Sequence, residues 1–186
     1  MSRSGVYPGS FNPPTVAHLA IAAAAREQRS LDRVDLVISR VTLAKEHVEL
    51  PLVEHRVEVL EATAQRIPWL AVRITDAQLL ADIAEGYDVL IMGADKWVQI
   101  NDLRWYDGEA GRREALARLP ELAIVPRPPH QVPAAHLLDV APDLAEVSST
   151  AARAGAVDLM TPEARRFADA TGAWVDDARY RSWLER

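Results

Sequence analysis

Short apolar runs alternate along the chain with longer stretches whose apolar positions recur at helical spacing. The apolar runs cover 3–8, 34–39, 69–74, 87–92 and 122–125, with a weaker run at 137–140. Continuous apolar runs bounded by turn residues are typical of strands buried on both faces. The helical stretches cover 16–29, 53–67, 77–84, 112–119 and 162–170, whereas 40–52 and 97–107 show no clear period. We therefore expect an α/β fold, with a doubly wound parallel sheet of five to six strands and a small C-terminal helical tail.

Composition limits the class of protein. The chain has 186 residues, of which 49% are hydrophobic, so we expect one domain over 1–186 whose C-terminal helical part begins at about residue 148. It contains no cysteine, which excludes a disulfide framework and cysteine-ligated metal. We see no signal peptide and no membrane span, and expect a cytoplasmic protein. The net charge of −6 argues against a nucleic-acid partner but permits a small phosphate site. Assembly into a homo-oligomer is left open.

The stretch VYPGSFNPPTVAHLAI leads from the first predicted strand, through a proline-rich turn, into a helix that begins near Thr15. Such a turn leaves backbone N–H groups free at Gly9, Ser10 and Phe11, next to the positive end of the helix dipole, where an anion is stabilised. Thr15 and His18 lie three residues apart, so both side chains reach the same spot. A hydroxyl and an imidazole N–H suit oxygens that gain charge during phosphoryl or nucleotidyl transfer.

A second anion site is predicted where consecutive hydroxyl side chains precede a short helix. The hydroxyls belong to Ser148, Ser149 and Thr150, and Arg153 follows on the first turn of that helix. Backbone N–H groups and a guanidinium at a helix N-terminus both favour bound anions. A capped surface helix is the plain alternative.

Several motifs together resemble one family. GSFNPPTVAH and SSTAAR are similar to motifs of the adenylyltransferase branch of the nucleotidyltransferase superfamily, which have the forms G-x-F-x-P-x-H/T-x-x-H and S-S-T-x-x-R. GADKWVQINDLRWYD, ELAIVPRPP and MTPEARRFADATGAW resemble, in the same order, segments of nicotinate and nicotinamide mononucleotide adenylyltransferases, which implies a Rossmann-like sheet. Thr15 replaces the family's usual first histidine and Ala17 its usual glycine, and TDAQLLADIAEGYD lacks the S-Y-T signature that helps bacterial enzymes hold the pyridine nucleotide.

The resemblance implies transfer of AMP from ATP to nicotinate or nicotinamide mononucleotide with release of pyrophosphate, a step of NAD biosynthesis. No covalent intermediate is needed, so the protein mainly positions two anions and stabilises charge. ATP and its Mg²⁺ are the expected cofactors, a small mononucleotide is the expected partner, and we expect no metal ligands from the chain itself. Two alternatives stay open: another phosphorylated acceptor such as phosphopantetheine, and a module that binds nucleotide without turnover.

The resemblance also implies roles for the nucleotide site. His18 would bind the α-phosphate oxygens, Thr15 would add a weaker donor, and Arg153 would hold the β- and γ-phosphates, so these three are the expected catalytic residues. A local capping bond is the plain alternative for His18. Asp95 and Gly93 would meet the adenosine ribose, with a helix N-cap as the competing explanation. The expected nucleotide-binding residues are Gly9, Ser10, Phe11, His18, Gly93, Asp95, Ser148, Ser149, Thr150 and Arg153.

Four residues are candidates for binding the acceptor. Trp105 aligns with the aromatic residue that stacks on the pyridine ring in the family, and Trp97 is its substitute; core packing could explain both. Lys45, after the second strand, could clamp a phosphate or be a solvated surface lysine. Arg56, at the start of the next helix, could do likewise, with a surface salt bridge as the simpler explanation.

Overall fold

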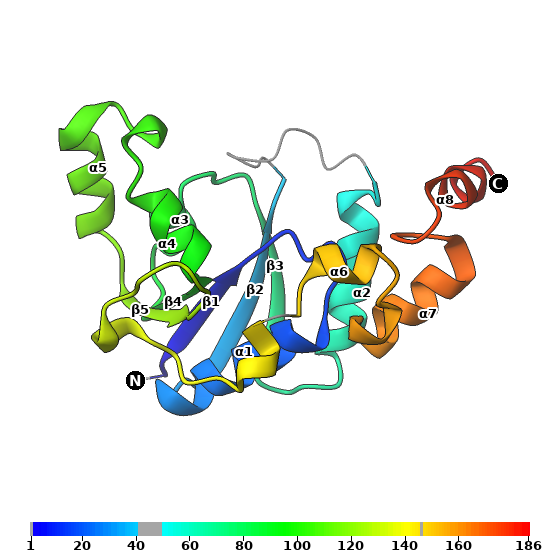
Figure 1. Cartoon of the computed structure of the whole chain (residues 1–186), viewed down its shortest axis with the longest axis horizontal. Helices are drawn as coiled ribbons and strands as arrows, with labels where there is room; N and C mark the ends of the chain where they lie inside the picture. The colour runs from blue at the N-terminus through cyan, green and yellow to red at the C-terminus, as the bar shows by residue number, and fades with distance from the viewer. Residues whose placement is uncertain (1, 41–49, 146) are drawn as a thin grey trace.

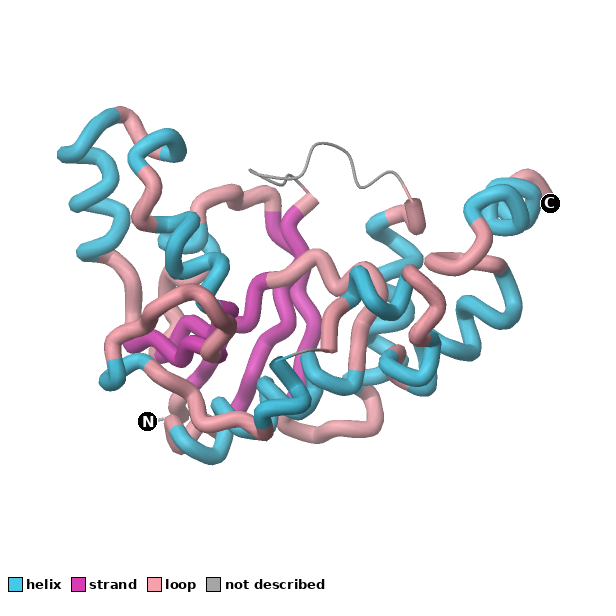
Figure 2. Tube along the Cα trace, viewed as in Figure 1, coloured by secondary structure: helices cyan, strands magenta, loops and turns pink. Residues whose placement is uncertain are grey.

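A parallel sheet of five strands forms the centre of the molecule (Figures 1 and 2). The computed structural model describes residues 2–40, 50–145 and 147–186. The strands are β1 (Ser4–Pro8), β2 (Arg33–Ser39), β3 (Leu70–Thr75), β4 (Val89–Gly93) and β5 (Glu121–Val125), in the spatial order β3-β2-β1-β4-β5. All neighbouring pairs are parallel. The order reverses direction between β1 and β4, which is the switch point where ligands bind in open α/β sheets.

Helices cover both faces of the sheet, as the doubly wound prediction requires. The helices are α1 (Val16–Gln28), α2 (Val53–Ala64), α3 (Leu80–Ile83), α4 (Ala94–Ile100), α5 (Gly108–Ala117), α6 (Ser149–Arg153), α7 (Pro162–Thr171) and α8 (Asp177–Leu184). Side chains of α1 and α2 join the core cluster that contains Leu36 and Ile38. The opposite face contributes Val37, Leu90 and Ile124 to a cluster with α3, α4 and α5. The α/β prediction is therefore confirmed.

A third apolar cluster lies at the C-terminal end. Helices α7 and α8 pack beside α2, at the opposite end of the molecule from α5 (Figure 1). Thr161 caps α7 by accepting a hydrogen bond from the Ala164 N–H, and Gly172 ends it at φ 87°, as the sequence predicts. The sequence predicts a single helix after residue 160, at 162–170. This prediction is wrong, because a second helix, α8, follows and buries Tyr180 in the same cluster.

Two further expectations need correction. The weak strand at 137–140 does not form: Leu137 makes one isolated bridge to Ile124, and the Leu138 N–H donates to the Ile124 carbonyl oxygen without a ladder continuing beyond this point. The region 97–107, where no period was visible, contains most of α4 and the 3₁₀ helix η1 (Leu103–Trp105). Helix α4 starts directly after β4 and is too short to show a period.

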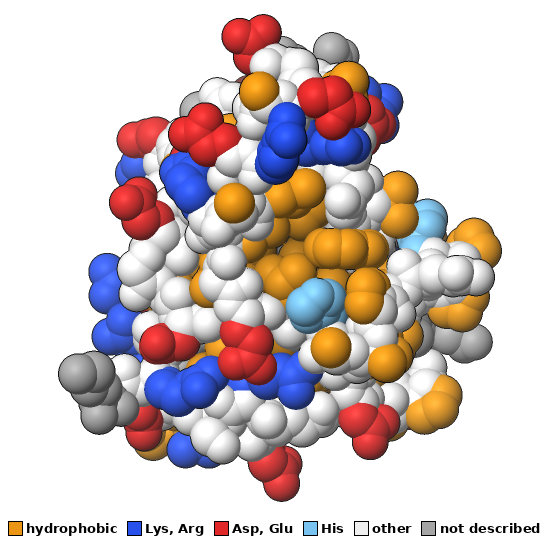
Figure 3. Space-filling view, turned by 90° about the vertical axis from the view of Figure 1, so that its left-hand side faces the viewer, with side chains coloured by type: hydrophobic (Ala, Val, Ile, Leu, Met, Phe, Trp, Pro, Cys, Tyr) orange, Lys and Arg blue, Asp and Glu red, His pale blue; other side chains and the backbone are white. Residues whose placement is uncertain are grey.

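Apolar side chains also reach the surface beside β5. Figure 3 views the molecule from the side of α5 and β5, and shows apolar side chains gathered in a hollow between charged rims. Trp97, Leu116 and Val132 are partly buried and pack against the core cluster on the α4 face of the sheet. Within the described part of the chain, no helix is long and apolar enough to cross a membrane.

Candidate active site

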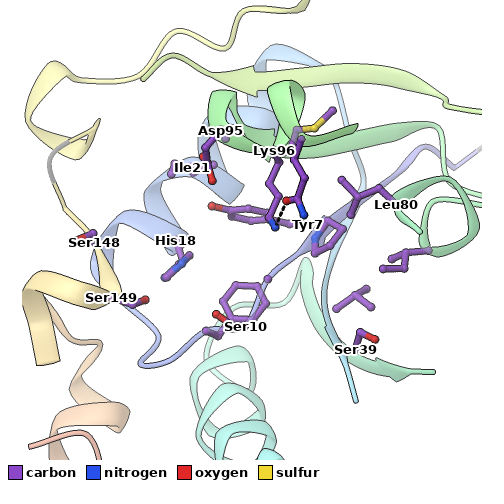
Figure 4. A pocket seen from close by; sticks show the side chains of 18 of the residues that line it. Tyr7, Ser10, His18, Ile21, Ser39, Leu80, Asp95, Lys96, Ser148 and Ser149 are labelled. Carbon is purple, nitrogen blue, oxygen red and sulfur yellow. Dashed lines mark hydrogen bonds between the residues drawn. The ribbon is translucent and has the colours of Figure 1, made fainter. Parts of the chain in front are cut away.

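A cavity of about 320 Å³ opens at the carboxyl edge of the sheet, around the switch point between β1 and β4 (Figure 4). The predicted site residues that line it are Gly9, Ser10, Phe11, Thr15, His18, Gly93, Asp95, Trp105, Ser148, Ser149, Thr150 and Arg153. Two predicted residues, Arg56 and Trp97, are absent from this lining, and Lys45 lies outside the described residues. We call the side formed by the β1–α1 turn and residues 147–153 the turn end. The side formed by α3, α4 and η1 is the α4 end.

The β1–α1 turn is held in place from several directions. The Gly9 N–H is not free as expected: it donates to the Val37 carbonyl oxygen at 3.0 Å and so continues the ladder past β1. Glycine nevertheless suits this position, because a Cβ would lie 3.0 Å from the Phe11 ring, so a larger residue would require that ring to shift. Arg56 is buried, 6% exposed, and donates to the Ser10 carbonyl oxygen at 2.8 Å. Arg56 therefore supports the turn from behind, which differs from both the expected phosphate contact and the surface salt bridge.

His18 is oriented by a reciprocal cap with Thr15. The Thr15 backbone N–H donates to His18 Nδ1 at 2.9 Å, and the Thr15 hydroxyl oxygen lies 2.8 Å from the same nitrogen. Because Nδ1 accepts, the proton of the neutral ring lies on Nε2. The ring points into the cavity (Figure 4). The capping bond and a ligand-binding role are therefore compatible, since they use different nitrogens.

The environment of His18 keeps the ring neutral. Burial, followed by the positive charge of Arg127, lowers the pKa of His18 to about 4. At neutral pH the ring is an N–H donor without a charge of its own. Thr15 is only 1% exposed, and its hydroxyl oxygen lies against His18 Nδ1.

The segment 148–153 docks directly on the β1–α1 turn. The Ser149 hydroxyl donates to the Pro13 carbonyl oxygen at 2.8 Å, and the Arg153 guanidinium donates to the Asn12 carbonyl oxygen. Ser148 caps α6 by accepting from the Ala151 N–H. Two motifs more than a hundred residues apart in the sequence thus form one wall, in which His18 and Arg153 both line the cavity.

Trp174 ties the C-terminal part of the chain to the same turn. Its indole Nε1–H donates to the Asn12 side-chain oxygen at 2.6 Å, and both residues are buried. The backbone N–H of Thr161 donates to the Pro14 carbonyl oxygen. Sequence reasoning does not find this contact, since no spacing connects Trp174 with a turn 162 residues away.

Gly93 and Asp95 meet the cavity at the end of β4. Gly93 is the N-cap residue of α4, which rules out Asp95 as that cap. A Cβ on Gly93 would lie 2.5 Å from the Asp95 Oδ1, so the glycine makes room for this carboxylate. Arg127, which follows β5, faces Asp95 with an Nη1–Oδ1 distance of 3.9 Å. Sequence reasoning missed Arg127. This residue follows a predicted strand, and the carboxyl end of that strand was expected at the same edge of the sheet as the cavity.

The α4 end is more apolar and contains the two candidate tryptophans in different settings. Trp105 lines the cavity, and its buried indole N–H has no hydrogen-bond partner among the described residues. A tryptophan placed for packing alone usually finds an acceptor, so this observation weighs against a purely structural role. Trp97 instead packs in the sheet cluster and contacts His136, with ring centroids 6.0 Å apart. The structure thus separates the candidate for stacking from its substitute.

The cavity is cationic although the chain is acidic. Its described lining contains three cations, Lys96, Arg127 and Arg153, and one carboxylate, Asp95. Among the described residues no group of three His, Cys, Asp or Glu side chains could hold a metal ion. The site can therefore hold an extended anion between an imidazole N–H and guanidinium groups, with an apolar compartment at one side.

Comparisons with known proteins agree with this geometry. A family model described as Cytidylyltransferase-like matches residues 6–155. A Bordetella avium protein named "Probable nicotinate-nucleotide adenylyltransferase" is 30% identical over 166 residues, which cover 82% of this chain and 76% of that protein. Proteins of the same name are 29% identical over 141 residues in Bacteroides thetaiotaomicron and 41% identical over 64 residues in Salinibacter ruber. The match to the Bacteroides thetaiotaomicron protein covers 68% of this chain and 65% of that relative's length. The match to the Salinibacter ruber protein covers 34% of this chain and 33% of that relative's length. This chain belongs to the cytidylyltransferase-like family.

Proposed function

We propose that this protein is an adenylyltransferase that transfers AMP from ATP to a pyridine mononucleotide, nicotinate or nicotinamide mononucleotide, and releases pyrophosphate, a step of NAD biosynthesis. The observation that carries the proposal is the wall in which His18 and Arg153, from two distant motifs, line one cationic cavity. The names of the relatives support nicotinate mononucleotide as the acceptor.

The geometry suits an in-line displacement. A phosphate oxygen of the mononucleotide attacks the α-phosphorus of ATP, the bond from that phosphorus to the bridging oxygen breaks, and pyrophosphate leaves with the electron pair. The Nε2–H of His18 would donate to the α-phosphate oxygens as their charge grows, while Arg153 and Arg127 would hold the leaving phosphates. Ser148, Ser149 and Thr150 would surround the nucleotide. No proton has to leave the protein.

Mg²⁺ would enter with ATP. The described cavity lining provides a single carboxylate, Asp95, which is enough for an ion held mainly by phosphate oxygens and water. When bound, the ion supplies charge neutralisation at the triphosphate. The Asp95 carboxylate would also accept hydrogen bonds from the ribose hydroxyls of the adenosine. Gly93 leaves room for this carboxylate because it has no Cβ.

We also propose that the whole chain, 1–186, works as one nucleotidyltransferase domain. Hydrogen bonds from Arg153 and Trp174 to Asn12 support this, because they connect the C-terminal part to the first turn. The partners would be small molecules, and a cytoplasmic location stays a prediction.

Pyrophosphate release tests the proposal. The purified chain is mixed with ATP, Mg²⁺ and one acceptor at a time: nicotinate mononucleotide, nicotinamide mononucleotide or phosphopantetheine. We expect release with a pyridine mononucleotide, in equal amount to the dinucleotide formed. Release with phosphopantetheine alone would overturn the acceptor, and ATP binding without release from any acceptor would instead identify a nucleotide-binding module.

A further inference from the structure

Lys96 brings an ammonium group to the α4 end of the cavity. It lies on the first turn of α4, lines the cavity, and its Nζ donates to the Gln99 side-chain oxygen at 2.5 Å (Figure 4). The contact orients the ammonium, which carries three N–H donors. Figure 4 shows Lys96 on the opposite side of His18 from Ser148 and Ser149. The ammonium therefore belongs to the end of the cavity away from the second motif.

The use of lysine at this position is unusual for this chain. The sequence contains nineteen arginines and only two lysines, Lys45 and Lys96. The other described cations of the cavity are arginines, whose planar forks suit phosphates, whereas an ammonium is a compact point charge. The lining of the α4 end includes the apolar side chains of Leu80, Ile83 and Ile100 beside the polar Gln99 and Asp95. A compact cation beside apolar side chains suits a flat ring that carries a single negative group.

We infer that Lys96, held by Gln99, selects acceptors whose ring carries a carboxylate over those that carry a carboxamide. The inference rests on the proposed function. The acceptor phosphate must lie beside the α-phosphate near His18, so the ring extends away from it, toward the α4 end. There the carboxylate of nicotinate forms a charge-assisted hydrogen bond with the ammonium, whereas the neutral carboxamide of nicotinamide gains less. Lys96 is thus a specificity residue for the ring and not a phosphate ligand.

Substitution of Lys96 measures the selectivity. Lys96→Met removes the charge and keeps the apolar stem, and Lys96→Arg keeps the charge. We expect Lys96→Met to lower kcat/KM for nicotinate mononucleotide by ~10- to 100-fold, the usual range for a hydrogen bond to a charged group, with a change under ~3-fold for nicotinamide mononucleotide. Lys96→Arg should keep most of the preference. Equal losses for both acceptors, a loss confined to the KM of ATP, or no loss at all would overturn the inference.

Binding without turnover provides a second readout that does not depend on activity. Lysine-labelled protein has only two side-chain Nζ groups to follow by NMR, and the Lys96 signal is identified by its absence in Lys96→Arg. Nicotinate mononucleotide alone should shift this signal, and nicotinamide mononucleotide should shift it less. Equal shifts or no shift would contradict the inference. If pyrophosphate release fails with both acceptors, the proposed function fails; if release occurs without selectivity, only this inference fails.

Discussion

The two ends of the cavity are built differently. At the turn end the backbone carbonyl oxygens of Ser10, Asn12 and Pro13 accept hydrogen bonds from side chains of two other elements, α2 and α6, so the backbone itself is fixed. At the α4 end the lining consists of side chains on a short helix and a 3₁₀ turn, with apolar neighbours. Donors that stabilise charge in a transition state must be preorganised, whereas ring recognition can be adjusted by single side chains. The comparison predicts that the chemistry and the choice of acceptor can be altered separately in this fold.

The largest expected effect tests the turn end. His18→Ala removes the Nε2–H donor and should lower kcat by at least ~100-fold while the protein stays folded, because the contact strengthens in the transition state. His136→Ala is the matched control, since His136 contacts Trp97 outside the cavity. Steady-state pyrophosphate release measures both variants. Near-normal turnover in His18→Ala would remove this residue from the chemistry.

The next effect tests whether the C-terminal part positions the turn. Trp174→Phe removes the indole N–H that donates to Asn12 and keeps an aromatic ring, and it should lower kcat by ~10-fold with little change in the KM of the acceptor. Trp183→Phe is the control from the same apolar cluster. In a double-mutant cycle, Asn12→Ala and Trp174→Phe should lose less together than the sum of their separate losses. Additive losses would mean that Trp174 contributes packing alone.

A smaller effect is expected at the α4 end. Trp105→Ala should raise the KM of the mononucleotide several-fold, by ~10-fold at most, and leave the KM of ATP nearly unchanged, because aromatic stacking adds a modest energy beyond burial. Trp105→Phe should restore most of the loss. Equal changes in both KM values would show that Trp105 supports the wall without touching the ring.

The smallest effect concerns protonation. The pKa of His18 is lowered to about 4 by burial and by Arg127, so Arg127→Gln should raise it toward 6.5. NMR titration of the imidazole measures the change. The folded-state pKa lies below the unfolded value, so the unfolded chain binds the proton first and stability is lost as pH falls from 6.5 toward 4. This loss should shrink in Arg127→Gln. A titration near 6.5 in the unaltered protein would contradict the buried setting of His18 beside Arg127.

Sequence reasoning succeeded at the turn end because its signals are local. Glycine, two prolines, Thr15 and His18 describe the strand end, turn and helix start within ten residues, and buried apolar runs predict all five strands. Chain topology then requires the strand ends to meet at one edge. These features place His18 at that edge, whereas the position of Arg153 was expected from the resemblance of SSTAAR, since none of the described strands ends directly before it.

The same reasoning failed where contacts connect distant segments or where an element is short. The Gly9 N–H donates to the Val37 carbonyl oxygen, and the Thr15 hydroxyl lies against His18. Neither contact can be predicted from the spacing of residues in the sequence. Lys96 and Arg127 were missed because a lone cation after a strand looks like a surface residue until the cavity is known. The partnership of Trp174 with Asn12 depends on tertiary packing of the C-terminal helices.

The path of the α-phosphorus of ATP tests the central claim most directly. ATP labelled at that atom is mixed with Mg²⁺, nicotinate mononucleotide and excess protein, and the label is followed through a single turnover. The account predicts that all transferred label appears in the dinucleotide, that an equal amount of pyrophosphate forms, and that none stays on the protein. Label on the protein, or label released as free AMP with no dinucleotide formed, would contradict direct transfer in this cavity.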